Sequence, residues 1–204
     1  MLKKTLLTLG MCLLLTGTAL AGVNEKIDNG SNHQISYPVF TFTNQKAATR
    51  ANNFIEEKVF DTLNLLEDPI YVEVSTSYKV IKETDKYVSI TFTTANYTGG
   101  AHDMYYTYGL VFDKKTGKRL PYTAFADKIS KENLQKGIAD GTLPVFTADL
   151  KTRSSAPFLK DLNNFSVSKN YILAPDGHVY LMYQPYELDC YAAGVTYVKI
   201  PLKQ

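Results

Sequence analysis

Apolar and polar residues alternate with a period of two in three stretches of the chain, and this alternation predicts β-strands. The apolar positions are Val72, Val74, Tyr78 and Val80, then Val88, Ile90 and Phe92, and then Tyr106, Tyr108, Leu110 and Phe112. Such strands place one face on a core and the other in water, which is typical of antiparallel sheet. Residues 35–43 are rich in β-branched and aromatic side chains and predict a further strand, in which Pro38 favours an edge position.

The C-terminal part of the chain carries the same kind of signal. Pro175, Asp176 and Gly177 separate two apolar runs and predict a β-hairpin. A last strand is predicted around residues 198–202, and Gly117 is expected to supply the positive φ of the turn that follows Phe112.

Two stretches follow helical spacing instead. Asn44 can cap a helix over residues 45–66, whose apolar positions are Ala47, Ala51, Phe54, Ile55, Val59 and Leu63. Ser130 can cap a shorter helix that reaches Asp140 and ends at Gly141. Residues 142–165 carry no clear period. We therefore expect an α+β fold with antiparallel sheets and a packed helix in each of two closely associated subdomains, over residues 35–98 and 99–204, after a flexible segment at residues 22–34.

The first residues indicate export. Lys3 and Lys4 precede an apolar stretch of signal-peptide length, and small residues at Ala19 and Ala21 fit cleavage, so residues 1–21 are predicted to be a signal peptide. The alternative is a retained membrane anchor, but the stretch is short for a membrane span, so we expect none after cleavage. The formal net charge of +2 equals the charge of the two lysines, so the exported chain is neutral and nucleic acid is not an expected partner. Cys190 would be the remaining cysteine, and we expect it to be buried.

Reactive chemistry has weak support in the sequence. His102 and Asp103 follow the double glycine of "YTGGAHD", residues 97–103, but adjacent side chains in an extended segment point to opposite faces. Neither a nucleophile elbow nor metal-ligand spacing is present, so we expect no catalytic residue, no metal and no cofactor. Gly99 and Gly100 are expected to let the backbone turn where side chains would clash.

Tyrosine is the most suggestive residue type, with 15 copies against no tryptophan. A tyrosine presents a broad apolar ring with a polar tip, which suits contact with a sugar ring or a protein, although sheet core is the commoner use of aromatic residues. The candidate binding residues gather in two segments: Tyr97, Gly99, Gly100, His102 and Tyr105 in the first, and Tyr186, Glu187 and Tyr191 in the second.

Two longer segments resemble a known family. "NYTGGAH" with "YYTYGLVFDKKTGKRLPYTAFAD", and "YILAPDGHVYLMYQPYELDCYAAGVTYVKIPL", are similar to the RsiV-like domain of unknown function that also accompanies PdaC-type peptidoglycan deacetylases. The part before them resembles the small companion domain often found upstream. The resemblance implies an envelope-side module: RsiV is an anti-sigma factor that binds lysozyme, whereas the deacetylase's chemistry belongs to a separate catalytic domain whose metal-ligand signature this sequence lacks.

These observations leave three hypotheses of function. The first is an exported, non-enzymatic binding module of the bacterial cell envelope, periplasmic or secreted, with a peptidoglycan-related ligand or lysozyme as partner. The second is an envelope polysaccharide hydrolase or deacetylase that uses His102 and a nearby carboxylate such as Asp103 or Glu187. The third is a folded spacer or assembly partner, which would show a large apolar surface patch.

Overall fold

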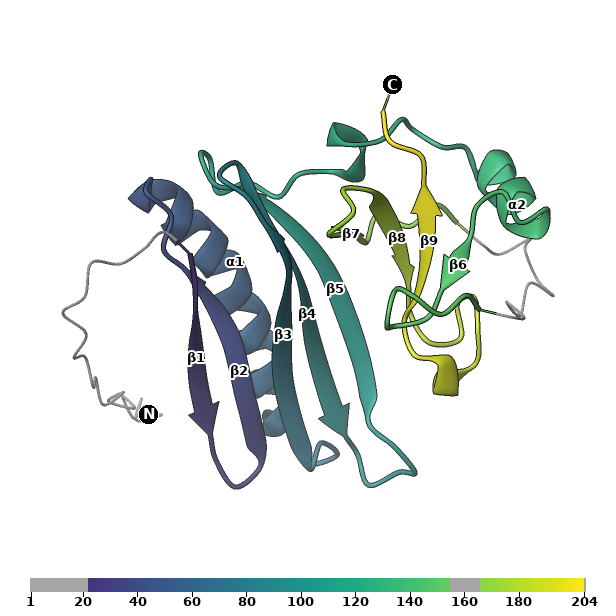
Figure 1. Cartoon of the computed structure of the whole chain (residues 1–204). Helices are drawn as coiled ribbons and strands as arrows, with labels where there is room; N and C mark the ends of the chain where they lie inside the picture. The colour runs from purple at the N-terminus through teal and green to yellow at the C-terminus, as the bar shows by residue number, and fades with distance from the viewer. Residues whose placement is uncertain (1–21, 155–165, 204) are drawn as a thin grey trace.

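The computed structural model describes residues 22–154 and 166–203 of the chain, which form two β-sheets and two α-helices (Figure 1). The predicted signal peptide lies outside the described residues. The first sheet has five strands in the order β1-β2-β3-β4-β5, and the second has four in the order β6-β9-β8-β7. The α+β class predicted from the sequence is confirmed.

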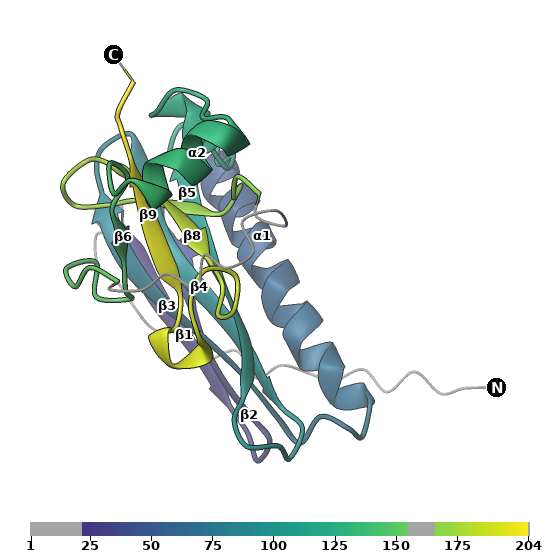
Figure 2. The ribbon, with the colours of Figure 1, turned by 90° about the vertical axis from the view of Figure 1, so that its right-hand side faces the viewer.

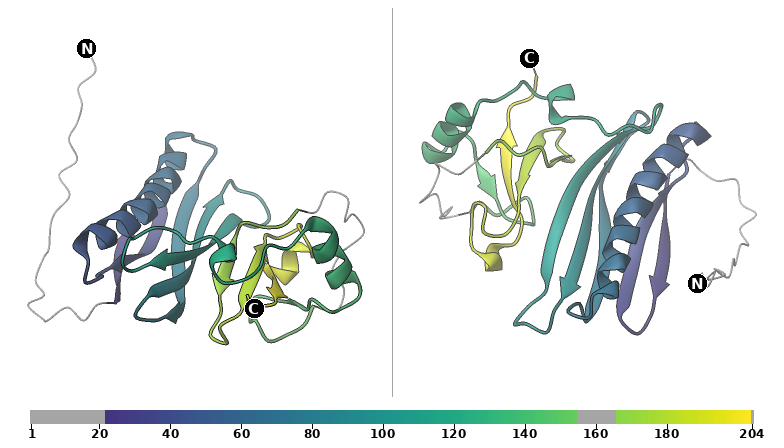
Figure 3. Two further views of the ribbon diagram at one scale, coloured as in Figure 1. Left: turned by 90° about the horizontal axis from the view of Figure 1, so that it is seen from above. Right: turned by 180° about the vertical axis from the view of Figure 1, so that it is seen from behind.

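The first sheet is built from consecutive strands: β1 (Val23–Asn29), β2 (His33–Phe40), β3 (Glu73–Glu83), β4 (Tyr87–Tyr97) and β5 (Met104–Asp113). Neighbouring strands are antiparallel except β2 and β3, which are parallel because α1 (Gln45–Asn64) connects them. A short 3₁₀ helix, Leu65–Glu67, follows α1. The helix packs on one face of the sheet (Figure 3).

Helix α1 forms where its cap and its apolar positions agree. The Asn44 side chain accepts hydrogen bonds from the backbone of Lys46 and Ala47, and the buried face carries Ala47, Ala51 and Ile55. These side chains meet the even-numbered residues of β4 and β5 in one core, which include Val88, Ile90, Phe92, Leu110 and Phe112. The period-two pattern therefore identified this buried face correctly. The expectation that the other face lies in water is wrong for β4 and β5, because Ser89, Thr107 and Val111 on that face are also buried.

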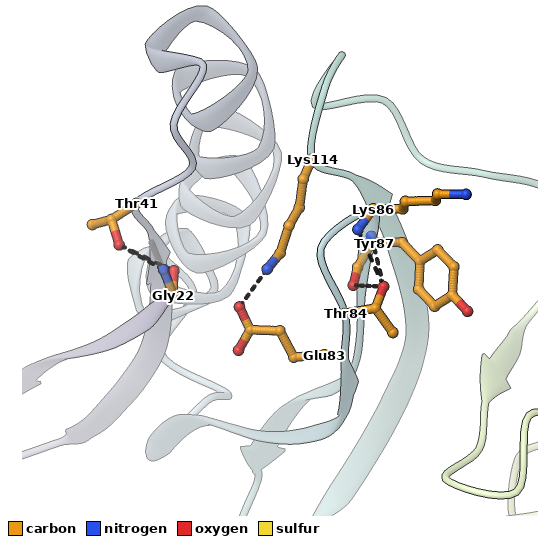
Figure 4. Close-up of polar contacts among 7 residues, drawn as sticks. All are labelled: Gly22, Thr41, Glu83, Thr84, Lys86, Tyr87 and Lys114. Atoms are coloured by element: carbon orange, nitrogen blue, oxygen red, sulfur yellow. Dashed lines mark hydrogen bonds and ion pairs between the residues drawn. The ribbon is translucent and has the colours of Figure 1, made fainter. Parts of the chain in front are cut away.

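The turn between β3 and β4 is closed by local hydrogen bonds (Figure 4). Thr84 Oγ1 accepts from the backbone N–H groups of Lys86 and Tyr87, at 3.3 and 3.1 Å. Beside it, Lys114 Nζ lies 2.6 Å from a carboxylate oxygen of Glu83 and joins the end of β5 to the end of β3.

The second sheet consists of short strands: β6 (Val145–Phe146), β7 (Tyr171–Leu173), β8 (Val179–Tyr183) and β9 (Thr196–Ile200). Helix α2 (Lys131–Ala139) is capped by Ser130 and packs on this sheet through Leu134 and Ile138. The 3₁₀ helices Tyr122–Ala124 and Tyr191–Ala193 lie in the connections. Gly177 has a φ of +84° in the predicted hairpin turn.

The second sheet packs beside β5, on the face of the first sheet that α1 does not cover (Figure 2). Two side-chain amides hold the free edge of β5. Gln184 accepts from Thr107 N–H at 2.9 Å and donates to Thr107 C=O at 3.0 Å. Asn170 accepts from Gly109 N–H and also donates to Thr107 C=O, at 2.7 Å. A β-carbon at Gly109 would collide with the Tyr171 backbone. The two sheets are thus tightly joined.

The structure corrects two expectations about the N-terminal part. Residues 22–34 are not a loose segment, because they form β1 and the start of β2, where backbone pairing stabilises a polar sequence. Pro38 lies in β2, which is an inner strand. β2 pairs with β3 only through residues 33–35. Pro38 lies beyond this paired segment, where β3 does not need a hydrogen bond from its backbone nitrogen.

The strand predicted over residues 106–112 is β5, and it pairs with β4 in the first sheet. The first sheet therefore extends past residue 98, where the sequence suggested a division. How the chain divides into domains stays a prediction.

Candidate functional site

A groove of about 700 Å³ opens between the first sheet and the loops of the second. Its floor is the face of β3, β4 and β5 that points away from α1, and its wall is the segment from Tyr191 to Tyr197. Two residues of the "YTGGAHD" loop, His102 and Asp103, complete the rim. The groove therefore brings together His102 and Tyr105 of the first candidate segment and Tyr191 of the second, and the other five candidate residues do not line it.

The floor of the groove is lined by small hydroxyl side chains. They belong to Ser75, Ser77, Thr91, Thr93 and Thr107. Register places Ser77 opposite Thr93, and Thr93 opposite Thr107. The Thr93 and Thr107 hydroxyl oxygens lie 2.9 Å apart. Hydroxyl groups can both donate and accept, so this floor suits a ligand with many hydroxyl or amide groups.

A cluster of aromatic rings surrounds Tyr191, where the wall of the groove meets its rim. The His102 ring stacks on Tyr191 with centroids 3.9 Å apart, and Tyr105 and Tyr186 each lie 5.8 Å from it. Tyr191 O–H donates to the backbone carbonyl of Asp103 at 2.7 Å. These contacts fix the loop after β4 against the 3₁₀ helix before β9, so the ring surface is formed by two distant parts of the sequence.

Tyr186 is held in an unusual backbone conformation. Its φ is +72°, a region that residues other than glycine rarely adopt, and its side chain is 69% exposed. Its N–H donates to Asp189 C=O at 2.9 Å, and the neighbouring Glu187 carboxylate accepts from Gln184 N–H. Strained positions cluster at functional sites, and here the loop holds an aromatic ring out toward solvent beside the groove.

The other candidates from the first segment shape the loop. Tyr97 O–H donates to Gly100 C=O at 3.0 Å and closes the turn. Gly99 has a φ of +83°, as the double glycine predicted. Gly100 is different, because its φ is not positive. The expectation that side chains would clash here is wrong, since a β-carbon at either glycine would meet no other atom. Tyr97 also lines a smaller hollow of about 160 Å³ that shares Asp103 with the groove.

Two tyrosines of the groove, Tyr105 and Tyr197, stay protonated at neutral pH. Burial raises the pKa of Tyr105, and nearby Tyr191 raises it further. Burial likewise raises the pKa of Tyr197 to about 12. Both phenols are therefore neutral, and the groove presents hydrogen-bonding groups with little charge.

The groups considered for reactive chemistry are used in other ways. His102 Nδ1 lies 2.9 Å from the backbone carbonyl of Asp103. Within residues 22–154 and 166–203, no cluster of three His, Cys, Asp or Glu side chains is arranged for a metal ion. The expectation that Cys190 is buried is wrong: it is exposed, because Leu188 occupies the buried position of this loop.

Sequence reasoning missed the hydroxyl floor and the amide side chains that anchor it. The signal for the floor was present, because Ser75, Ser77, Thr91 and Thr93 are the polar half of the period-two pattern. Asn170 and Gln184 carried no signal, since their role depends on which strand edge lies beside them.

A second hollow, of about 790 Å³, lies at the start of α2. It is lined by apolar residues such as Tyr122 and Ile129 and by several basic side chains, among them Arg119 and Lys128. None of the eight candidate binding residues lines it.

The fold and the groove define an α+β protein with two joined sheets and an aromatic-walled groove between them. Residues 25–105 match the family model described as "Deacetylase PdaC", and residues 118–203 match that of "Protein of unknown function (DUF3298)". The two matches, with the solved structures below, support a PdaC/DUF3298-type domain of unknown function, which confirms the resemblance seen in the motifs. No curated protein matches the sequence.

Two solved structures support the same fold. A DUF3298 family protein from Pseudomonas aeruginosa PAO1 has a TM-score of 0.57 and 16% identity, over 89% of this chain and 92% of that one. A member of the DUF3298 family from Bacteroides fragilis NCTC 9343 has a TM-score of 0.53 and 15% identity, over 90% of this chain and 93% of that one. The two domain types point to an extracytoplasmic domain associated with the cell envelope. Among the described residues, no helix has the length and apolar content needed to cross a membrane.

Proposed function

We propose that the protein is an exported, non-enzymatic binding module of the bacterial cell envelope, and that the groove takes a peptidoglycan-related glycan. The observation that carries the proposal is the joint placement of the Tyr191 ring cluster and the hydroxyl floor in one groove. Neither feature would be sufficient alone. Together they offer the two kinds of surface that a sugar needs.

A sugar ring has an apolar face of C–H groups and a rim of hydroxyl or acetamido groups. The exposed Tyr186 ring and the half-buried Tyr191 ring suit the first, because aromatic rings combine broad apolar area with a polar tip. The Ser and Thr hydroxyls of β3 and β4 suit the second. The smaller hollow beside Tyr97, which shares Asp103 with the groove, is a second place for a sugar unit.

Lysozyme is the other ligand that the sequence suggested, and the groove favours it less. A cationic enzyme is best held by clustered carboxylates, but Asp103 is the one acidic residue in the groove lining, and the exported chain is formally neutral. A contact with lysozyme would have to depend on shape and on the tyrosine rings.

A hydrolase or deacetylase that uses His102 is the alternative in a different class of function. The match to a family model named for a deacetylase favours a test of it. The geometry favours binding instead, because the His102 ring stacks on Tyr191 and its Nδ1 contacts a backbone carbonyl. Incubation with sacculi separates the two, since an enzyme would release reducing sugar or acetate, and His102→Ala would abolish that release.

Co-sedimentation with purified sacculi tests the proposed function. We expect the wild type to sediment with sacculi, and Tyr191→Ala to bind about tenfold more weakly, since loss of one stacking ring costs roughly 1–1.5 kcal/mol. The matched control is Tyr106→Ala, which removes a half-exposed tyrosine from β5 on the α1 side of the sheet. Equal binding by the wild type and Tyr191→Ala, or no binding by either, would refute the proposal. Retention on immobilised lysozyme but not on sacculi would replace the glycan by lysozyme.

A further inference from the structure

The outer edge of β1 is open. Among the strands that the structure describes, β1 has one neighbour, β2, and it forms the end of the five-stranded sheet (Figure 1). Residues 24–29 are exposed, and the Ile27 side chain is 59% exposed. An exposed edge of this length offers unpaired N–H and C=O groups to another strand.

The pairing with β2 decides which backbone groups are free. At one end Thr41 N–H donates to Gly22 C=O, and at the other Gly30 N–H donates to His33 C=O (the Gly22 and Thr41 pair appears in Figure 4). Hydrogen-bonded pairs alternate along an antiparallel ladder, so the even-numbered residues of β1 face β2. The odd-numbered residues Glu25, Ile27 and Asn29 direct their backbone groups to the open edge.

This alternation restricts how a second copy of β1 could pair. In a symmetric antiparallel pair the odd-numbered residues must pair with each other, so the residue on the two-fold axis is either odd-numbered, within a hydrogen-bonded pair, or even-numbered, between two such pairs. Centring on Lys26 or Asp28 places two like charges opposite each other, and centring on Asn24 places Lys26 opposite Gly22, away from any carboxylate. Centring on Glu25 places two carboxylates opposite each other, whereas centring on Asn29 faces Asp28 with Gly30 and leaves few pairs. Centring on Ile27 places Ile27 opposite Ile27 and Lys26 opposite Asp28, twice.

The charges of β1 therefore select one register. Lys26 and Asp28 lie on the α1 side of the sheet, where Lys26 Nζ is 5.5 Å from the centre of the Tyr37 ring and Asp28 is 3.7 Å from His33 Nε2. In the register centred on Ile27 each lysine faces the carboxylate of the other copy, and no like charges are opposed. The exposed Ile27 side chains cover each other on the axis.

We propose that two copies of this chain associate through β1 in this register and form one continuous ten-stranded sheet. The two-fold axis of such a pair is perpendicular to the sheet, so both α1 helices lie on one side. Both grooves then open on the other side, which would let one dimer contact an extended envelope polymer at two places. The association itself does not depend on what the groove binds.

Charge exchange tests the register. The mass of the protein purified after export is measured against concentration, and we expect a dimer. Lys26→Glu and Asp28→Lys each oppose like charges twice, so each is expected to raise the dimer dissociation constant about tenfold. The double variant exchanges the charges and should restore the wild-type value. The matched control is Lys79→Glu, which reverses the charge of an exposed side chain on β3. It should leave the dimer dissociation constant unchanged.

Cross-linking gives an independent reading. In a Cys190→Ser background, Ile27→Cys places two thiols on the axis, with α-carbons about 5.5 Å apart, a separation that a disulfide can span. Mild oxidation should yield a disulfide-linked dimer, whereas Glu25→Cys should give no cross-linked product, because residue 25 lies opposite residue 29 in this register. The proposal would be overturned by a wild type that is monomeric at every concentration. It would also be overturned by a dimer dissociation constant that the charge reversals leave unchanged, or by equal cross-linking of Glu25→Cys and Ile27→Cys. Circular dichroism of every variant confirms that it is folded.

Discussion

Gln184→Ala should weaken the joint between the two sheets. The Gln184 side chain accepts from Thr107 N–H at 2.9 Å and donates to Thr107 C=O at 3.0 Å, and both residues are buried. Truncation leaves the Thr107 N–H without a partner, whereas the Thr107 C=O keeps its hydrogen bond from Asn170. An orphaned buried donor costs about 1–3 kcal/mol and the second hydrogen bond adds roughly 1 kcal/mol. We expect a loss of about 2–4 kcal/mol in the free energy of unfolding.

The assay is urea unfolding followed by circular dichroism, together with hydrogen exchange of the Thr107 amide. Gln34→Ala is the matched control, because Gln34 is exposed on β2, and its effect should stay within about 0.5 kcal/mol. Gln184→Glu sharpens the test, since a carboxylate cannot donate to Thr107 C=O. That variant should be destabilised at pH 7 and recover partly as the pH falls and the new carboxyl group is protonated. Unchanged exchange at Thr107 in Gln184→Ala would refute the reasoning.

Three further substitutions test other parts of the fold by the same unfolding assay. Gly109→Ala should cost about 1–3 kcal/mol, because the new methyl group collides with the backbone of Tyr171; wild-type stability would show that the joint is looser than described. Asn44→Ala should cost about 1 kcal/mol through loss of the α1 cap, whereas Asn64→Ala, at an end without a side-chain cap, should cost less. Asp176→Asn tests pH dependence. Burial alone would raise the pKa of the Asp176 carboxyl, but this carboxylate accepts hydrogen bonds, first from the Lys199 side chain, and they lower its pKa to about 2. Because the folded pKa lies below the ordinary 3.8, the carboxylate stabilises the fold above that pH and loses its effect as the pH falls toward 2, so the stability gap between wild type and variant should narrow over this range.

The sequence predicted the parts of the fold that depend on local pattern. The alternation of Val88, Ile90 and Phe92 identified the buried face of β4, and Asn44 marked the start of α1, because period and capping are properties of neighbouring residues. The same logic failed for residues 22–34. A strand whose side chains are nearly all exposed leaves no apolar period to read, and only backbone pairing with β2 reveals it.

The candidate site shows the same division. The sequence identified His102, Tyr105, Tyr186 and Tyr191 as candidate binding residues, but it could not show that their rings are in contact. Their meeting depends on how the loop after β4 and the segment before β9 are placed, and these are separated along the chain by β5, β6, β7 and β8. Which hydroxyls form the floor was also fixed by the face that α1 leaves uncovered.

By itself, then, the sequence determined the class of the fold, the buried face that β4 and β5 turn toward α1, and the segments where aromatic side chains gather, since each follows from the spacing of residues along the chain. The tertiary structure alone decided that the amides of Asn170 and Gln184 close the edge of β5, that a groove lies beside that edge, and that β1 is left open at the other end of the sheet. The physical reason is that hydrogen bonds between distant strands depend on the position of a partner, and no local pattern encodes that position.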